Sequence, residues 1–158
     1  MRWYVFALLL FVAPSAAAQQ SAKPASTQVL NHIFASSTYF DSEGKCQAEK
    51  NTVLRRWNVP LFPAAIPPFE SCTTIKAEGL VGEADFYAAV VDASGKVLEK
   101  VEGVLSFSEN GLASQAIDWK HLKIPAAGTY YFVLKINGQE VKRLPMVFAR
   151  NSANRKKK

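Results

Sequence analysis

The chain contains few of the side chains from which active sites are built. It has two histidines, His32 and His121, and it lacks the motifs of serine hydrolases, zinc proteases, phosphate-binding loops and dinucleotide-binding folds. Asp118 lies three residues before His121, and on a strand this spacing puts the two side chains on opposite faces. We therefore expect Asp118 and His121 to be solvated polar side chains. The sequence predicts no catalytic residue, no metal site and no cofactor, and hence a protein that is not an enzyme.

Long apolar runs are also scarce. The unbroken run of residues 3–13 follows the positive charge of Arg2, and the small residues 16–18 precede a polar stretch. This order is that of a secretory signal peptide, and the run is too short for a membrane anchor. The next apolar stretch, residues 59–69, contains four prolines, which exclude a membrane-spanning helix. We expect cleavage after Ala18 and no transmembrane segment in the mature chain.

The remaining residues, 19–158, have the length of one domain. Residues 19–27 are small and polar and predict a flexible leader, residues 28–149 predict the folded domain, and residues 150–158 predict a disordered basic tail. No cysteine follows the cleavage site, which argues against a lipid anchor there. We expect the mature protein in a bacterial periplasm or outside the cell.

Positive charge is concentrated at the C-terminal end. The chain has a formal net charge of +6, and removing Arg2 and the last four cations leaves +1 for residues 19–154. A nucleic-acid-binding protein would carry its cations on the folded domain, and export separates this protein from that partner. The tail cations are instead candidates for contact with an anionic lipid or polysaccharide surface, the alternative being a terminus that only aids solubility. They are Arg155, Lys156, Lys157 and Lys158.

Cysteine is limited to Cys46 and Cys72. In an oxidising compartment an even number of cysteines indicates disulfides, and two cysteines allow one intramolecular bond. Closing a loop of this size stabilises a fold by roughly 3 kcal/mol in the chain-entropy model. Free or metal-binding thiols are the alternative, but no Cys-x-x-Cys spacing and no neighbouring histidine supports a metal site.

What the chain does contain is β-forming segments separated by turn residues. Beyond residue 18 no long segment has helical periodicity, and turn signals recur regularly in the second half, as in sandwiches and barrels. The proline-rich residues 59–69 are expected to form a stiff, irregular connection. The pattern predicts an all-β domain with strands at residues 29–40, 52–57, 73–77, 85–92, 96–101, 112–124 and 130–136.

The final hairpin is the most strongly specified element. Side chains alternate through residues 130–136, and the dipeptide Asn-Gly at 137–138 is the preferred loop of a type I′ turn. Such a loop fixes two cross-strand pairs, Lys135 with Glu140 and Leu134 with Val141. One pair joins opposite charges and the other is apolar, on opposite faces of the sheet, which supports this register.

The same region is similar to part of a known family. Residues 124–138 (IPAAGTYYFVLKING) resemble the penultimate strand of bacterial immunoglobulin-like domains and, more loosely, the ending of a group of small exported bacterial proteins. The resemblance implies a single immunoglobulin-like antiparallel β-sandwich in which Tyr130 is the tyrosine-corner residue, its hydroxyl bonded to nearby backbone. Strand order across residues 72–149 fits this pattern. Cys46 and Cys72 both precede the tyrosine-corner strand, so they do not form the inter-sheet bridge of antibody domains.

The proline-rich connection holds candidates for contact with a partner. If they are exposed, a stiff apolar loop binds a protein with little loss of conformational entropy. If they are buried, the same side chains close one end of the sandwich, as most aromatic side chains do. The sequence leaves both interpretations open for Leu61, Phe62, Ile66 and Phe69.

These observations favour an exported, non-enzymatic protein-binding or assembly module of the cell envelope. Its partner would be an envelope or extracellular protein, since the fold alone implies no particular role. One alternative is a protein held at an anionic envelope surface by its basic tail. Another is a small exported enzyme or enzyme inhibitor, which requires polar side chains to converge in a cleft, with Asp118 and His121 as the first candidates.

Overall fold

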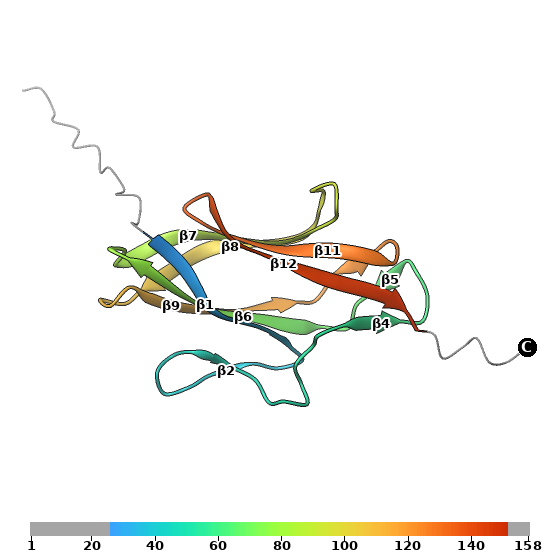
Figure 1. The fold of residues 1–158 in the computed structure, drawn as a ribbon, viewed down its shortest axis with the longest axis horizontal. Coiled ribbons are helices and arrows are strands. Elements are labelled where there is room, and N and C mark those ends of the chain that lie inside the picture. The colour runs from blue at the N-terminus through green and yellow to red at the C-terminus, as the bar shows by residue number, and fades with distance from the viewer. Residues whose placement is uncertain (1–25, 152–158) are drawn as a thin grey trace, which may run out of the picture.

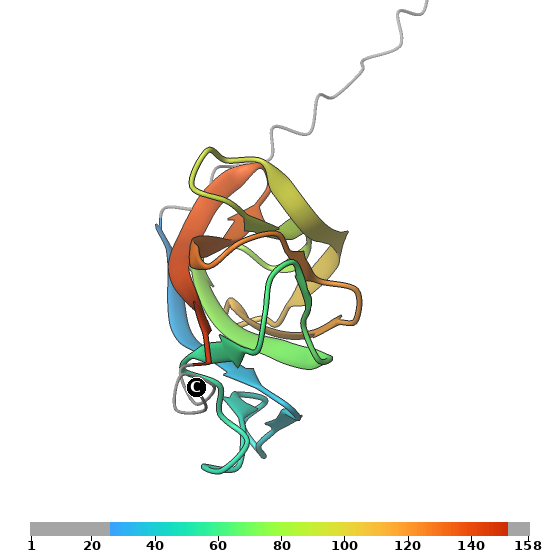
Figure 2. The same ribbon diagram turned by 90° about the vertical axis from the view of Figure 1, so that its right-hand side faces the viewer.

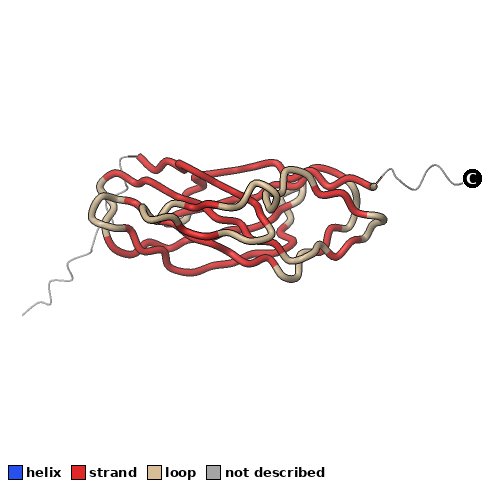
Figure 3. Tube along the Cα trace, turned by 90° about the horizontal axis from the view of Figure 1, so that it is seen from below, coloured by secondary structure: helices blue, strands red, loops and turns tan. Residues whose placement is uncertain are grey.

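The computed structural model describes residues 26–151, which form strands and turns and no helix (Figures 1 and 3). This confirms the predicted all-β class. No helix able to cross a membrane occurs in this range. The strands are β1 (Ser26–Ala35), β2 (Tyr39–Phe40), β3 (Cys46–Gln47), β4 (Trp57–Val59), β5 (Ala64–Ala65), β6 (Phe69–Glu78), β7 (Gly82–Val91), β8 (Val97–Phe107), β9 (Leu112–Trp119), β10 (Lys123–Ile124), β11 (Gly128–Ile136) and β12 (Gln139–Arg150).

Two sheets pack face to face as a sandwich (Figures 1 and 2). One sheet has the strand order β4-β12-β11-β7-β8, and the other has the order β1-β6-β9. Neighbouring strands in these sheets are antiparallel, except that the short β4 runs parallel to β12. Two short ribbons, β5–β10 and β2–β3, lie beside the sandwich. The predicted single antiparallel β-sandwich is therefore the observed architecture.

Alternation of side chains along the central strands builds the core between the sheets. On β11 the buried residues are the even-numbered ones from 130 to 136, which face the core, together with Val133 on the outer face. On β6 the odd-numbered residues from 69 to 77 face the core. Burying one large apolar side chain stabilises a fold by about 1.5–3 kcal/mol. Aromatic rings with centroids no more than 6.3 Å from a neighbouring ring dominate this core: Trp57, Phe69, Trp119, Phe132 and Phe148.

Two predicted strands in the first half of the chain are wrong in extent. The strand expected at 29–40 ends at Ala35, where the chain leaves the sheet, and β2 is a separate two-residue strand. Residues 52–56 form turns with one isolated bridge, between Ala35 and Val53. Threonine and valine favour strands there, but β-propensity creates no ladder where a second strand does not run alongside.

Other predicted boundaries also shift. The strand expected at 112–124 breaks after Trp119, because β10 pairs with β5 at the end of the sandwich instead of continuing β9. The strands extend from Ser26 to Arg150, so the last two residues of the predicted leader belong to β1. The predicted signal peptide and the cations of residues 155–158 lie outside the described residues.

The final hairpin keeps the predicted turn but not the whole predicted register. Lys135 pairs with Glu140, as expected. A bulge follows immediately, and Leu134 pairs with Lys142 instead of Val141. A β-bulge adds one residue to one strand only, and the turn sequence does not determine where that residue is inserted.

Candidate functional site

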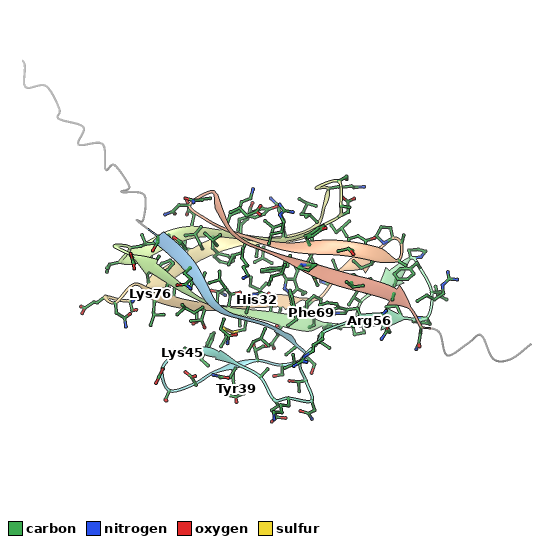
Figure 4. All side chains as sticks on the ribbon, viewed as in Figure 1. His32, Tyr39, Lys45, Arg56, Phe69 and Lys76 are labelled. Atoms are coloured by element: carbon green, nitrogen blue, oxygen red, sulfur yellow. A yellow bond between two sulfur atoms is a disulfide. The ribbon has the colours of Figure 1, made fainter. Side chains whose placement is uncertain are left out.

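Residues 36–56 leave β1 and form a flap against the outer face of the three-stranded sheet (Figures 1 and 4). The β2–β3 hairpin of this flap is joined to β6, the central strand of that sheet, by the Cys46–Cys72 disulfide. Both half-cystines are buried. The predicted disulfide is therefore confirmed, and it fastens the flap to one sheet and does not link the two sheets.

Hydrogen bonds hold the flap on either side of the disulfide. The N–H and the hydroxyl of Thr38 donate to Glu70 Oε2 at 2.6 and 2.5 Å. The N–H of Cys46 donates to Thr74 Oγ1 at 2.9 Å, and Asn31 Nδ2 donates to the Cys46 carbonyl at 2.8 Å. These bonds attach the flap to both β6 and β1.

The tip of the flap is organised by the carboxylate of Asp41. It accepts hydrogen bonds at 2.9 Å from the N–H groups of Glu43 and Lys45 and from Gln47 Nε2. Gly44 adopts φ +73°, a conformation that this tight turn requires and that glycine adopts without strain. The hydrogen bond from Gln47, followed by those from the backbone, holds the pKa of Asp41 below its usual range. The turn is thus built around a charged carboxylate.

A groove of about 710 Å³ lies between the flap tip and the turn that joins β8 to β9. Phe40, which is 49% exposed, contributes an aromatic wall, and Leu112 adds further apolar surface. An apolar wall beside several convergent polar groups is the usual composition of a ligand-binding site. The polar lining includes Thr74, Ser106, Ser108, Asn110 and Ser114.

The hydroxyl groups of the groove are already joined in short networks. Ser114 Oγ donates to Thr74 Oγ1 at 2.9 Å. Ser108 Oγ lies 2.5 Å from Asn110 Oδ1 and 2.9 Å from the Leu112 carbonyl oxygen. Because a hydroxyl both donates and accepts, the partly exposed Ser114 and the exposed Ser108 can each exchange one of these bonds for a bond to a ligand. The groove therefore offers hydrogen bonding and apolar contact.

The proline-rich connection does not present the apolar surface considered from the sequence. Ile66 and Phe69 are 5% and 2% exposed and belong to the core, and Phe62 packs half-buried against it. Only Leu61 of the four candidates is exposed, at 59%. The connection crosses the end of the sandwich, where β5 pairs with β10 and the N–H of Ile66 donates to the Leu122 carbonyl at 2.9 Å. This position buries Ile66 and Phe69.

The other residues considered from the sequence lie apart from the groove. The Tyr130 hydroxyl donates to the Ala126 carbonyl at 2.9 Å, four residues upstream. Asp118 is exposed and pairs with Lys120 at 3.2 Å, and His121 is exposed at the end of the sandwich. Across residues 26–151 no group of three or more His, Cys, Asp or Glu side chains is placed to hold a metal ion.

The partly buried His32 points toward the space between the two sheets, a position that the sequence did not predict. Its Nδ1 is 2.6 Å from Thr73 Oγ1, and its ring centroid is 4.5 Å from those of Phe34 and Phe132. Burial, assisted by the positive charge of Lys142, lowers the pKa of His32 from 6.5 to about 4. The available signal was the two-residue spacing from Phe34, which puts both rings on one face of a strand.

Comparison with known proteins gives no family. No protein-family model matches the chain, and no curated protein sequence matches it. Among solved structures, the dimeric latent PorU of Porphyromonas gingivalis is 16% identical over 60% of this chain and 9% of that one, with a TM-score of 0.40. The β-glucuronidase of Bifidobacterium dentium, complexed with coumarin-3-O-glucuronide, is 12% identical over 78% of this chain and 17% of that one, with a TM-score of 0.39. At these TM-scores neither likeness supports an argument about this protein.

Proposed function

We propose that this protein is an exported, non-enzymatic protein-binding module of the cell envelope, with an immunoglobulin-like sandwich as its scaffold. The observation that carries the proposal is the groove beside the flap, in which the half-exposed Phe40 stands next to a lining of hydroxyl groups. An exposed aromatic side chain beside a concave surface with several convergent polar groups has the composition of a ligand-binding site.

The construction of the flap supports a binding role. A hairpin fixed by a disulfide and several hydrogen bonds loses little conformational entropy when a partner is bound. A peptide group brings one donor and one acceptor, which hydroxyl groups match in either orientation. An apolar side chain on the same peptide would contact Phe40 and Leu112. The partner is therefore an exposed segment of another protein.

Two observations support the location and the scaffold. The disulfide requires an oxidising compartment, which agrees with the signal peptide expected at residues 1–18. The bond from the Tyr130 hydroxyl to the Ala126 carbonyl has the geometry of a tyrosine corner, the feature on which the immunoglobulin-like resemblance rests.

Capture from an envelope extract tests the proposal. The bait is the chain from Gln19 to Lys158, compared with Phe40→Ser and with Leu61→Ser, a matched loss of one exposed apolar side chain far from the groove. We expect a specific protein to be retained by the unchanged chain and by Leu61→Ser, and to be lost with Phe40→Ser. Equal capture by all three baits, with all of them folded, overturns the proposal.

The same experiment separates the alternative of a basic tail bound to an anionic surface. A fourth bait lacks residues 155–158. If captured material is lost only from this bait, and is released from the others by salt, the attraction is electrostatic and resides in the tail. Binding in the groove instead survives removal of the tail, because hydrogen bonds and apolar contacts do not depend on it.

A further inference from the structure

The outer edge of β8 is the longest strand edge without a paired neighbour in the described part of the chain. β8 spans 11 residues, pairs with β7 along nearly all of them, and has no strand on its other side. Of the other edge strands, β4 has three residues, β9 has eight and β1 has ten. Both β1 and β8 carry one bulge, and that of β8 lies near its start, between Val97 and Glu99. A long unpaired edge is a template for another strand unless its side chains prevent pairing.

The hydrogen-bond ladder determines which backbone groups of β8 face outward. The N–H of Asn137 donates to the Asp85 carbonyl, so the backbone of Asp85 is turned toward the β11 side of β7. Direction alternates along a strand, so Phe86 is turned toward β8 and its partner Gly103. By the same alternation, the N–H and C=O groups that face away from β7 include those of Lys100, Glu102 and Val104.

Two of these residues carry opposite charges on the outer face of the sheet. Lys100 pairs with Ala89 of β7 and Glu102 pairs with Tyr87, which places their side chains on the face away from the core. Lys100 Nζ lies 3.0 Å from Glu102 Oε1, and both side chains are more than half exposed. An exposed pair of this kind contributes little to the stability of one copy, so both charges remain available to a second strand.

We propose that two copies of this chain associate by antiparallel pairing of β8 with β8 about a twofold axis at Val101. In this register Lys100 of each copy lies opposite Glu102 of the other, and both residues direct their backbone groups toward the partner strand. Opposite charges directly across two strands are favourable. On the core-facing side of the strands, Glu99 of one copy lies opposite Gly103 of the other, and Gly103 has no side chain to obstruct it. The two five-stranded sheets then form one continuous sheet.

Charge selects this register over its neighbours. An axis at Glu102 sets the two copies of that carboxylate directly opposite each other, which is unfavourable. An axis at Gly103 sets Glu102 opposite Val104 and leaves every charge unmatched. A strand of unrelated sequence also meets a lysine and a glutamate without partners, which is how charged edges resist aggregation. The edge of β8 is therefore complementary in charge to a copy of itself, and its charges make pairing with a strand of unrelated sequence unfavourable.

Sedimentation of the chain from Gln19 to Lys158, between about 1 µM and about 1 mM, tests this inference. We expect a concentration-dependent dimer. Lys100→Glu or Glu102→Lys alone places like charges opposite each other and is expected to weaken association about tenfold or more. Mixing these two variants restores all the opposite-charge pairs, so the mixture is expected to form a heterodimer although neither variant associates alone.

The control is Lys120→Glu, which makes the same change of charge at an exposed residue outside β8 and is expected to leave the dimer unchanged. A monomer at every concentration overturns the inference, as does a mixture of the two variants that stays monomeric. So does an equal loss of the dimer in the control. Phe40→Ser, which alters the groove, leaves this association intact, so the two proposals can fail separately.

Discussion

His32 is a titratable side chain that packs against aromatic rings, where a positive charge is unfavourable. Its ring lies among Phe34 and Phe132, and its Nε2 is buried without a hydrogen-bond partner. A buried imidazole without a second partner is tolerated when neutral, but a proton on it would place a charge in an apolar environment. The depressed pKa of about 4 expresses that cost. The residue therefore couples folding to pH although it does not line the groove.

We expect the free energy of unfolding to fall as pH decreases from about 6.5 to about 4. Between these two pKa values the unfolded chain holds a proton on His32 that the folded chain does not, so acid favours unfolding. Over this window the loss amounts to roughly 3 kcal/mol, at about 1.4 kcal/mol for each unit of pKa difference. Above pH 6.5 the histidine no longer contributes to the slope. Urea unfolding measured at several pH values gives the dependence.

The second histidine provides the control for this prediction. His121 is exposed, so His121→Gln is expected to preserve the dependence of stability on pH between 4 and 6.5. His32→Phe is expected to remove most of it, since phenylalanine has no proton to gain. The absolute stability of His32→Phe is not the readout, because Thr73 loses a hydrogen-bond partner. An unchanged slope in His32→Phe would contradict the assignment.

At the scale of elements, the turn from β8 to β9 is a tight connection between the two sheets. Gly111 adopts φ +72° there, and a Cβ on it would lie 2.3 Å from the Ala77 carbonyl oxygen. The turn cannot yield easily, because the Ala77 N–H donates to the Gly111 carbonyl and the Gly111 N–H donates to the Ser108 carbonyl. Glycine is therefore required at this position for two independent reasons.

Gly111→Ala is expected to destabilise the fold more than Gly95→Ala. Gly95, in the turn between β7 and β8, has φ +88°, but a Cβ added to it would meet no atom within 4 Å, so its substitution introduces backbone strain alone. Such strain costs about 1–3 kcal/mol. Gly111→Ala adds the clash with the Ala77 carbonyl to the same strain. Urea unfolding of both variants measures the difference, and equal losses would show that the turn relaxes.

The elements that the sequence predicted well are those determined locally. The Asn-Gly turn and the pair Lys135–Glu140 depend on neighbouring residues only, and both are present. The bulge after that pair and the loss of the strand at 52–57 depend on which other strands lie alongside, and local propensity contains no such information. The strand predicted at 112–124 is two strands for the same reason, because local propensity does not show that β10 pairs with β5 instead of continuing β9.

The candidate site was less predictable than the strands for a similar reason. Phe40 meets residues of β6, β8 and β9 in the groove only because the flap folds back onto the sheet. The disulfide that fixes the flap could be predicted from composition and compartment, but the surface it creates could not. In the proline-rich connection, an apolar pattern is the same whether the side chains are exposed or buried, and the structure buries Ile66 and Phe69.

At the scale of the whole molecule, the protein has two tiers, the sandwich and the flap, which are stabilised by different interactions. The buried residues of the main core come from Trp57 onward, and among the described residues of the flap only Leu54 packs against that core. The flap is held instead by the disulfide and by hydrogen bonds to β6 and β1. Apolar burial, the dominant stabilising term, therefore belongs to the sandwich.

Removing the disulfide is expected to release the flap while the sandwich stays folded. Replacing both Cys46 and Cys72 by alanine should lower the free energy of unfolding by roughly 3 kcal/mol, the value for closing a loop of this size. Hydrogen exchange should then show faster exchange at the flap amides of Ser36, Thr52 and Leu54, which are hydrogen-bonded in the structure. Amides of β7 and β11 should exchange only through global unfolding, and so lose no more protection than the roughly 3 kcal/mol by which the global free energy of unfolding falls.

The flap and the sandwich are distinguished by how much hydrogen-exchange protection each loses when the disulfide is removed. If the flap amides lose clearly more protection than the β7 and β11 amides, the disulfide acts on the flap beyond its effect on global stability, and the groove beside Phe40 depends on oxidation in the compartment where the protein works. If all amides lose the same protection, the two-tier description is wrong, because the flap and the sandwich then unfold as one cooperative unit. Capture of the groove's partner by the double variant separates the same outcomes, since a released flap cannot hold Phe40 in place.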